Sequence, residues 1–176
     1  MVYNYFEQVE YEEPIKFLKD AGVEVIVISA SQKDLQSLHH ARTGDKFRAD
    51  LLLNQTSSED YDALVLPGGV INADSLRSNE TAQRWLLDFL DSGRPIAAIC
   101  HAPWLLVSAD AVEGKRLTSY YTIKDDIINS GGEWVNLPVV VDDNLITCRH
   151  LDDIPKFNEA IINMLGNKSP DSIKIS

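Results

Sequence analysis

Short apolar runs alternate with amphipathic stretches along this chain, and the alternation predicts strands separated by helices. The clearest helix carries apolar residues at the spacing of one helical face: Ala82, Trp85, Leu86, Phe89 and Leu90. Two continuous apolar runs, at residues 62–66 and 95–99, are typical of strands that are buried on both faces.

Weaker patterns complete this alternation. They predict helices at 10–21, 101–109, 122–130 and 152–165, a strand at 23–28, and hairpin strands at 135–141 and 145–148. Residues 30–58 show no clear periodicity, and we interpret them as a loop or hairpin that covers one edge of the sheet. The pattern indicates an α/β fold with a mostly parallel sheet and helices on both faces.

The length and composition indicate one domain. The chain has 176 residues, of which 44% are apolar, and this is enough for a substantial core. We expect the domain to span residues 1–166 and the tail, residues 167–176, to be frayed.

The charge argues against several classes of partner. The formal net charge is −11 and the isoelectric point is about 4.7, whereas nucleic acids and anionic membranes are bound by basic surfaces. No apolar run approaches the ~20 residues that span a bilayer, and the acidic N-terminal segment is unlike a secretory signal. With two cysteines and no need for a disulfide, the chain fits a reducing compartment, and we expect it to be cytoplasmic.

We predict neither a metal site nor a cofactor. The adjacent His39 and His40 cannot share a helical face, so we interpret them as solvated histidines.

The strongest chemical signal is the segment PIAAICHAPWLL, in which a buried strand leads directly into Cys100 and then into a helix. This is the pattern of a nucleophile elbow, with cysteine in the place of serine. The end of a strand and the start of a helix both favour an exposed thiolate, so we expect Cys100 to be ionised near neutral pH. The alternative is a buried, inert cysteine.

Two neighbouring features fit the same chemistry. His101 follows the cysteine and is a candidate base, although it could equally be an ordinary residue at the start of a helix. Gly68 and Gly69 follow the strand at 62–66, and their N–H groups could face the same crevice and form an oxyanion hole with the N–H of His101. The alternative for the two glycines is a simple turn.

An ordered set of motifs resembles the PfpI/ThiJ family of the class I glutamine-amidotransferase-like superfamily. The matching segments are FEQVEYEEP, DALVLPGG, ADSLRSNE, PIAAICHAP, LTSYYTIKDDIINSGGEWV and VVVDDNLITCRH. The resemblance implies a flavodoxin-like three-layer sandwich and a homodimer or larger homo-oligomer.

The resemblance also implies a role for each matched residue. Cys100 matches the nucleophile, and His101 matches its neighbour. Glu7 matches a buried acid that hydrogen-bonds the thiol. Burial would raise the pKa of that carboxyl group, so that it could donate a proton to the thiolate. Asp74 matches an acid that completes a Cys-His-acid triad across a subunit interface.

The remaining matches concern the substrate. Gly69 and His101 match the backbone donors of the oxyanion hole, and Tyr120 matches a tyrosine that lines the pocket. We expect Gly68, Trp104 and Tyr120 to contact the substrate.

The sequence departs from the family pattern at three places. Only Met1–Asn4 precede the FEQVE segment, so a central strand should be short or missing, which affects the placement of Glu7. Ala102 replaces a usual glycine, which a helical residue tolerates. Cys148 replaces a common serine, and we interpret it as a small core residue or, alternatively, a second redox thiol.

The leading interpretation is a cysteine-dependent hydrolase or lyase that acts on small carbonyl compounds, glycation adducts or peptides. The resemblance implies peptidase, deglycase and glyoxalase-like activities, and a crevice crowded by Trp104 and Tyr120 favours small carbonyls over folded proteins. One alternative is a non-catalytic stress protein that senses oxidants through Cys100. A lesser alternative is a glutaminase, since His150-Leu151-Asp152 has the spelling of a His-x-acid pair, although we expect that loop to point elsewhere.

Overall fold

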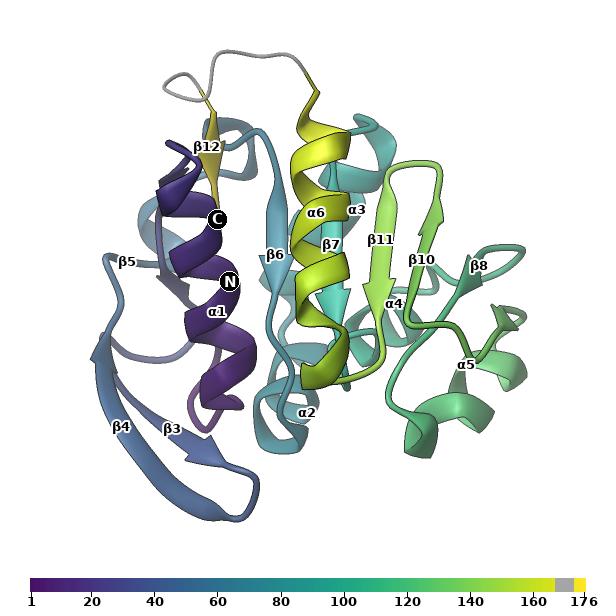
Figure 1. Ribbon diagram of the computed structural model, residues 1–176, viewed down its shortest axis with the longest axis horizontal. Coiled ribbons are helices and arrows are strands. Elements are labelled where there is room, and N and C mark those ends of the chain that lie inside the picture. Colours follow the sequence, from purple (N-terminus) through teal and green to yellow (C-terminus); the bar gives the residue numbers. More distant parts are fainter. Residues whose placement is uncertain (167–172) are drawn as a thin grey trace.

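The computed structural model describes residues 1–166 and 173–176. A β-sheet runs through the molecule between two layers of helices, with a long hairpin beside it (Figure 1). This arrangement confirms the flavodoxin-like α/β sandwich that the sequence predicts. Among the described residues, no helix is long and apolar enough to cross a membrane.

The two helical layers are made from different parts of the chain. Helices α1 (Gln8–Asp20) and α6 (Ile154–Leu165) pack together on one face of the sheet. Helices α2 (Val70–Arg77), α3 (Glu80–Asp91) and α4 (Trp104–Ser108) pack together on the other. The predicted apolar face of α3 is the face that is buried.

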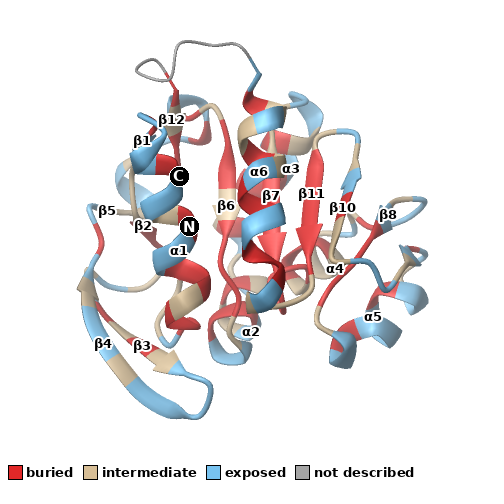
Figure 2. Ribbon diagram, in the orientation of Figure 1, coloured by how far each residue is buried: buried red, intermediate tan, exposed pale blue. Residues whose placement is uncertain are grey.

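Four strands of three or four residues form one half of the sheet, in the order β10 (Val139–Asp142), β11 (Leu145–Cys148), β7 (Ile96–Ile99) and β6 (Leu64–Leu66). They run parallel except for β10, which pairs antiparallel with β11 as the predicted hairpin. Every residue of β7 and β11 is buried (Figure 2), which explains why these strands read as continuous apolar runs.

The other half of the sheet is built from very short strands. The predicted strand at 23–28 divides into β1 (Glu24–Val25) and β2 (Ile28–Ser29), and β5 (Leu51–Leu52) pairs parallel with β2. Strand β12 (Lys174–Ile175) pairs parallel with β1. Ile175 also bridges Ala63, which immediately precedes β6, so β12 lies between the two halves of the sheet.

The prediction of a frayed tail is therefore wrong for residues 173–176, while residues 167–172 lie outside the described part of the chain. Ile173 and Ile175 are buried, and each contributes about 1.5–3 kcal/mol through the apolar surface that it removes from water. The expectation of a shortened strand before the FEQVE segment is confirmed. Residues 1–2 and 173–176 together occupy that central position: Val2 bridges Ser29, and Val65 N–H donates to the Ser176 carbonyl.

Residues 30–58 contain a hairpin, which is one of the two predicted alternatives. Strands β3 (Asp34–His39) and β4 (Arg42–Arg48) pair antiparallel and lie beside the start of α1 (Figure 1). The hairpin is tied to that region by backbone and side-chain bonds, such as Leu38 N–H to the Phe6 carbonyl at 2.8 Å and the Ser37 hydroxyl to Gln8 at 2.8 Å.

The remaining elements flank the sheet beyond β10. Strands β8 (Arg116–Leu117) and β9 (Glu133–Trp134) pair parallel, and α5 (Lys124–Asn129) lies between them in the chain. Short 3-10 helices complete the described elements: η1 (Leu53–Gln55), η2 (Ser58–Asp60), η3 (Tyr121–Ile123) and η4 (Leu151–Asp153).

Candidate active site

Cys100 occupies a strained turn at the carboxyl end of β7. Its φ of 65° lies in the left-handed region, which is uncommon for a residue with a side chain. Neighbouring backbone groups hold this conformation: its N–H donates to the Cys148 carbonyl at 2.9 Å, and its carbonyl accepts from Tyr120 N–H at 2.8 Å. Such strain persists where the surrounding structure fixes it, as in a nucleophile elbow.

The helix after the cysteine starts later than the sequence predicts. Residues 101–103 form a turn, and α4 begins only at Trp104. The groups that face the sulfur are instead the backbone N–H groups of Gly69 and His101. These are the two donors that the family resemblance implies for the oxyanion hole.

The two glycines after β6 are required by close packing. A Cβ on Gly68 would lie 2.6 Å from Cys100 Cβ and 2.9 Å from the Ile99 carbonyl oxygen. Gly69 has a φ of 94°, and a Cβ there would lie 2.7 Å from the nitrogen of Glu7. Glycine therefore lets the chain pass close to the nucleophile.

The acid that contacts the thiol is Glu10, and our assignment of Glu7 to this role is wrong. Glu10 is 2% exposed, hydrogen-bonds the Cys100 thiol and interacts with Gly68 N–H. Glu10 lies on the inner face of α1, four residues before Pro14. Glu7 comes before the first turn of α1, and its side chain turns toward the hairpin, where Oε2 accepts from His40 N–H at 2.9 Å.

Burial controls the protonation of the Glu10–Cys100 pair. Desolvation raises the pKa of Glu10 to about 8, so this carboxyl group mostly keeps its proton at neutral pH. Its Oε2 atom is sealed from solvent without a well-aligned hydrogen bond, which also disfavours the charged form.

The thiol is more difficult to ionise than we expected. Desolvation raises the pKa of Cys100 well above its ordinary value, the charge of Glu10 raises it further, and the N–H groups of Gly69 and His101 lower it. Cys100 as a whole is 7% exposed. The sequence-based expectation of a free thiolate at neutral pH is therefore wrong, because the strand end is buried under its neighbours. Ionisation of the sulfur is coupled to the proton on Glu10.

His101 connects the sulfur to a hydroxyl group. Its Nδ1 lies 3.2 Å from Cys100 Sγ, and its Nε2 lies 3.0 Å from Thr122 Oγ1. Desolvation lowers the pKa of His101 to about 4, so the imidazole is neutral at neutral pH. A tautomer with hydrogen on Nε2 donates to Thr122 and leaves Nδ1 free to accept the thiol proton.

Two aromatic side chains flank His101. The ring of Tyr120 lies 4.9 Å from the imidazole and that of Trp104 lies 5.5 Å from it, centroid to centroid. Two contacts fix the position of Trp104: its Nε1–H donates to Asp126 at 2.6 Å, and the guanidinium of Arg77 lies over its ring. Both aromatic residues are therefore placed to contact a substrate.

These groups line one cavity of about 1010 Å³. The predicted site residues that line it are Glu7, Gly69, Cys100, His101, Trp104 and Tyr120. Glu10 lines it as well. Thus a buried thiol, a carboxyl group that holds a proton and a neutral imidazole meet in a space large enough for a ligand.

Comparison with known proteins establishes the family of this chain. The family model of the DJ-1/PfpI family matches residues 1–164. The chain belongs to the DJ-1/PfpI family. An uncharacterised protein of Archaeoglobus fulgidus is 43% identical over 162 residues, covering 92% of this chain and 94% of the relative.

Other relatives in the DJ-1/PfpI family carry descriptive names. Deglycase PfpI of Pyrococcus furiosus is 36% identical, covering 92% of this chain and 95% of the relative. General stress protein 18 of Bacillus subtilis is 37% identical, covering 92% of both. The crystal structure of an Anabaena variabilis protein with DJ-1/ThiJ/PfpI-like and ferritin-like domains has a TM-score of 0.85 and 30% identity, covering 97% of this chain and 47% of that one.

Two residues that the DJ-1/PfpI resemblance implied lie outside the cavity lining. Gly68 lies beneath the thiol rather than at the cavity surface. Asp74 is exposed on α2 and lines a separate surface hollow with Arg77 and Asn79. Its contribution across a subunit interface stays a prediction.

The loop that carries His150 does not point away from the site, contrary to our expectation. His150 and Leu151 line the same cavity as Cys100. However, the imidazole nitrogens of His150 lie 3.7 Å from carboxylate oxygens of Asp152 and Asp153 and make no contact with the sulfur. His101 is therefore the imidazole that acts directly on the thiol.

Cys148 is a core residue, which was one of its two predicted alternatives; the other was a second redox thiol. It is fully buried in β11, its thiol lies 3.7 Å from the His150 carbonyl, and desolvation raises its pKa to about 12. Neither cysteine is in a disulfide. Cys100 is thus the thiol that reaches the cavity.

Sequence reasoning missed three polar residues of the site: Glu10, His40 and Thr122. Glu10 could have been found by extending the buried face of α1 backward from Leu18 through Pro14 in steps of four. His39 and His40 are exposed, as expected for solvated histidines, yet His40 also lines the cavity. No signal in the sequence points to Thr122. Within residues 1–166 and 173–176, no group of three His, Cys, Asp or Glu side chains is arranged to hold a metal ion.

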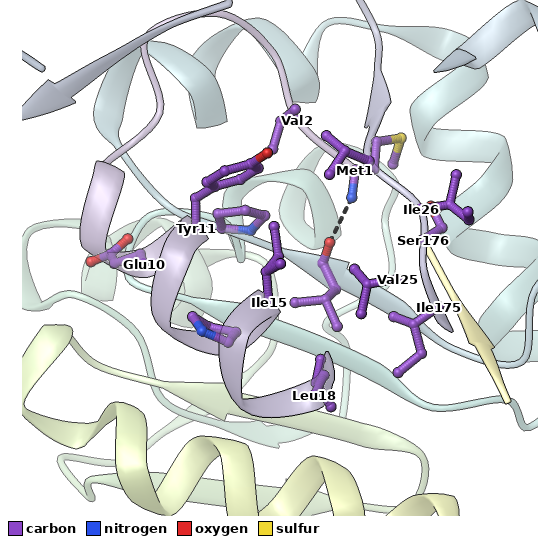
Figure 3. Close-up of a pocket in the computed structure, with 14 residues that line it drawn as sticks. Met1, Val2, Glu10, Tyr11, Ile15, Leu18, Val25, Ile26, Ile175 and Ser176 are labelled. Atoms are coloured by element: carbon purple, nitrogen blue, oxygen red, sulfur yellow. Dashed lines mark hydrogen bonds between the residues drawn. The ribbon is translucent and has the colours of Figure 1, made fainter. Parts of the chain in front are cut away.

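A second, much smaller cavity of about 30 Å³ lies behind α1 (Figure 3). Its lining is mostly apolar, and the carboxyl group of Glu10 points away from it. The Met1 nitrogen donates to the Val65 carbonyl at 2.7 Å beside it (Figure 3). This cavity is a packing gap next to the divided central strand and holds none of the reactive groups.

Proposed function

We propose that this chain is a cysteine-dependent hydrolase that removes early carbonyl adducts from amino groups, and that it converts the released fragment to a 2-hydroxy acid. The observation that carries the proposal is the position of the Cys100 sulfur, which lies between the proton-holding Glu10 and the N–H groups of Gly69 and His101. A nucleophile, a proton donor and two oxyanion donors are the parts that carbonyl chemistry requires.

The reaction can be written for an adduct of methylglyoxal. The sulfur attacks the carbon that bears the nitrogen; the C–S bond forms, the C–N bond breaks, and the amine leaves with its electron pair and a proton. His101 Nδ1 takes the thiol proton. Glu10 gives its proton to the departing nitrogen, and the resulting carboxylate is placed to move a proton from one carbon of the hemithioacetal to the next, which yields a thioester. Water then hydrolyses the thioester to the 2-hydroxy acid and restores the thiol, so that one water is consumed for each adduct.

Two further points support this choice among the activities of the family. A relative that is 36% identical is named a deglycase. The cavity of about 1010 Å³ is larger than a free glyoxal needs, which favours an aldehyde still attached to a side chain or a peptide.

The test is turnover by the wild type and by the Cys100→Ala and Cys148→Ala variants. Purified adducts and free methylglyoxal are supplied separately, and both the amine and the hydroxy acid are quantified. We expect Cys100→Ala to abolish product formation and Cys148→Ala to retain it. Equal rates in the wild type and in Cys100→Ala would refute the proposal, because the adduct would then be decaying by itself.

The second candidate is a stress protein that senses oxidants through Cys100. The N–H groups of Gly69 and His101 that face the sulfur would also stabilise a sulfinate, and a relative that is 37% identical is named a general stress protein. Peroxide titration followed by mass spectrometry separates the two candidates. Stoichiometric oxidation of Cys100 in a protein that turns over no adduct and no glyoxal would favour the sensor.

A further inference from the structure

Glu7 has one occupied and one free carboxylate oxygen. The residue is 8% exposed, and its Oε2 accepts the His40 N–H at 2.9 Å, with His40 Nδ1 at 3.8 Å. Within the described residues, Oε1 has no hydrogen-bond partner, and Glu7 lines the cavity that contains Cys100. Glu7 therefore offers one free carboxylate oxygen as a hydrogen-bond acceptor for a ligand in this cavity.

The backbone around Glu7 is strained in a way that fixes this position. Five described residues other than glycine have a positive φ, and three of them, Tyr5 at 63°, His40 at 55° and Cys100 at 65°, line this cavity. Tyr5 N–H donates to the Gln36 carbonyl at 2.8 Å, which holds the segment before Glu7 against the hairpin. Strain concentrated at a cavity indicates that its wall is shaped for a ligand.

The charge of the cavity favours a cation. No lysine or arginine is among its described lining residues, and burial keeps Glu10 mostly protonated at neutral pH. Among the described lining residues, Glu7 therefore has no lysine or arginine partner. The imidazole that lies near its carboxylate is that of His40. The net charge of −11 on the chain adds a long-range attraction for positive ligands.

Aromatic rings provide a second feature that suits a cation. Tyr5, Trp104 and Tyr120 all line the cavity and are at least partly exposed; the guanidinium of Arg77 already lies over the Trp104 ring, so the two tyrosine rings are the ones open to a cation. The faces of tyrosine and tryptophan rings attract ammonium and guanidinium groups when water is excluded.

We propose that Glu7 is a specificity-determining residue that binds the amino or guanidino nitrogen from which Cys100 removes the adduct. This inference deepens the proposed function and rests on it, because it names lysine-type and arginine-type adducts as the substrate class. As the C–N bond breaks, the nitrogen keeps the electron pair and gains one proton to become a neutral amine or guanidine, which then takes a second proton from solvent and becomes cationic, and Glu7 Oε1 stabilises that charge. A thiol leaving group gains no charge and does not need Glu7.

The first experiment measures binding by calorimetry and needs no turnover. Nα-acetylarginine amide is compared with its neutral analogue Nα-acetylcitrulline amide, and Nα-acetyllysine amide with Nα-acetylnorleucine amide. The wild type should bind each cationic ligand at least 10-fold more tightly than its neutral counterpart, and the two pairs separate guanidine from amine recognition. Glu7→Gln should remove the preference, since glutamine can still accept the His40 N–H. Glu12→Gln, on an exposed residue of the helix that follows Glu7, should retain it.

The second experiment measures kcat/KM for methylglyoxal adducts of Nα-acetylarginine, Nα-acetyllysine and N-acetylcysteine. We expect Glu7→Gln to lower the first two at least 10-fold and the cysteine adduct less than 2-fold. Equal binding of cationic and neutral ligands by the wild type would overturn the proposal, and so would an equal loss for all three adducts. If no adduct is turned over while the binding preference holds, the proposed function fails and the cation subsite stands.

Discussion

The carboxyl group of Glu10 is hydrogen-bonded to the thiol of Cys100, and both groups are buried between α1 and the end of β7. The two groups affect each other in opposite directions: the charge of Glu10 raises the pKa of the thiol, whereas the hydrogen bond from Cys100 lowers the pKa of the carboxyl group, which burial has raised. The pair therefore titrates as a unit, and the reactive state is one in which a single proton is shared between carboxyl and sulfur.

Replacing Glu10 by glutamine should separate the nucleophilicity of the Cys100 sulfur from the proton transfer that Glu10 carries out. The Glu10→Gln variant loses the nearby charge, so the pH midpoint of Cys100 alkylation should fall. Turnover should fall by about 10²–10⁴-fold, because the proton can no longer move. Alkylation rates with iodoacetamide across pH, measured beside steady-state kinetics, test both effects. Glu12→Gln is the matched control, and an active Glu10→Gln variant would contradict this role.

Glu10 should also impose a pH dependence on stability. Its pKa is raised from 4.5 to about 8 in the folded protein, so the folded state holds a proton that the unfolded state releases. The stability from this proton is fully present below about pH 4.5 and is lost as the pH rises to about 8, by roughly 3–5 kcal/mol. Urea unfolding at pH 6 and pH 8.5 should show this loss in the wild type and a flatter profile in Glu10→Gln. Identical profiles in the two proteins would contradict it.

Thr122 should act by orienting His101. The hydroxyl lies 3.0 Å from His101 Nε2, and its removal in Thr122→Val frees the imidazole to rotate away from the sulfur. We expect kcat to fall by about 10-fold with little change in KM, and Thr122→Ser to restore the rate. Because Thr122 is exposed, the free energy of unfolding should change by less than about 0.5 kcal/mol. A rate loss that serine does not rescue would point to packing instead.

Asp74 provides a test of assembly. If it completes the site of a neighbouring subunit, Asp74→Asn and Cys100→Ala should both be inactive alone and should complement each other when mixed. Random pairing in a symmetric dimer gives about one quarter of the wild-type activity. Light scattering establishes the oligomeric state in the same samples. A fully active monomer would exclude this role for Asp74.

The stability of the central sheet should depend on β12. Ile175 is fully buried, and Ile175→Ala should cost about 2–4 kcal/mol of unfolding free energy. Lys174 is only partly buried in the same strand, so Lys174→Ala should cost well under 1 kcal/mol. Chemical denaturation of the two variants makes the comparison. Equal costs would mean that β12 does not form in solution.

Much of the fold could be predicted because strands that are buried on both faces appear in the sequence as continuous apolar runs. The runs before Gly68 and before Cys100 became β6 and β7, and the periodic segment after Asn79 became α3. The hairpin β3–β4 was less certain, since β4 is mostly exposed and the two buried positions of β3 are Leu35 and the polar Ser37, so the sequence shows no apolar alternation.

The site residues that follow directly after a strand were predicted, whereas those whose position depends on packing between distant segments were missed. Cys100, His101 and Gly69 adjoin strand ends, so their meeting follows from the parallel sheet. The exchange of Glu7 for Glu10 arose because the helix begins one residue after Glu7, and three residues of helix turn a side chain by most of a full rotation. The buried thiol was missed because desolvation depends on packing from distant segments.

Strand β12 has a consequence for how the molecule is made. Its partners β1 and Ala63 are synthesised much earlier than the residues of β12 that join them. A nascent polypeptide on the ribosome therefore carries two unpaired sheet edges until residues 173–175 emerge. Open edges are templates for pairing with other chains, so the newly made chain is exposed to misassembly until residues 173–175 have left the ribosome.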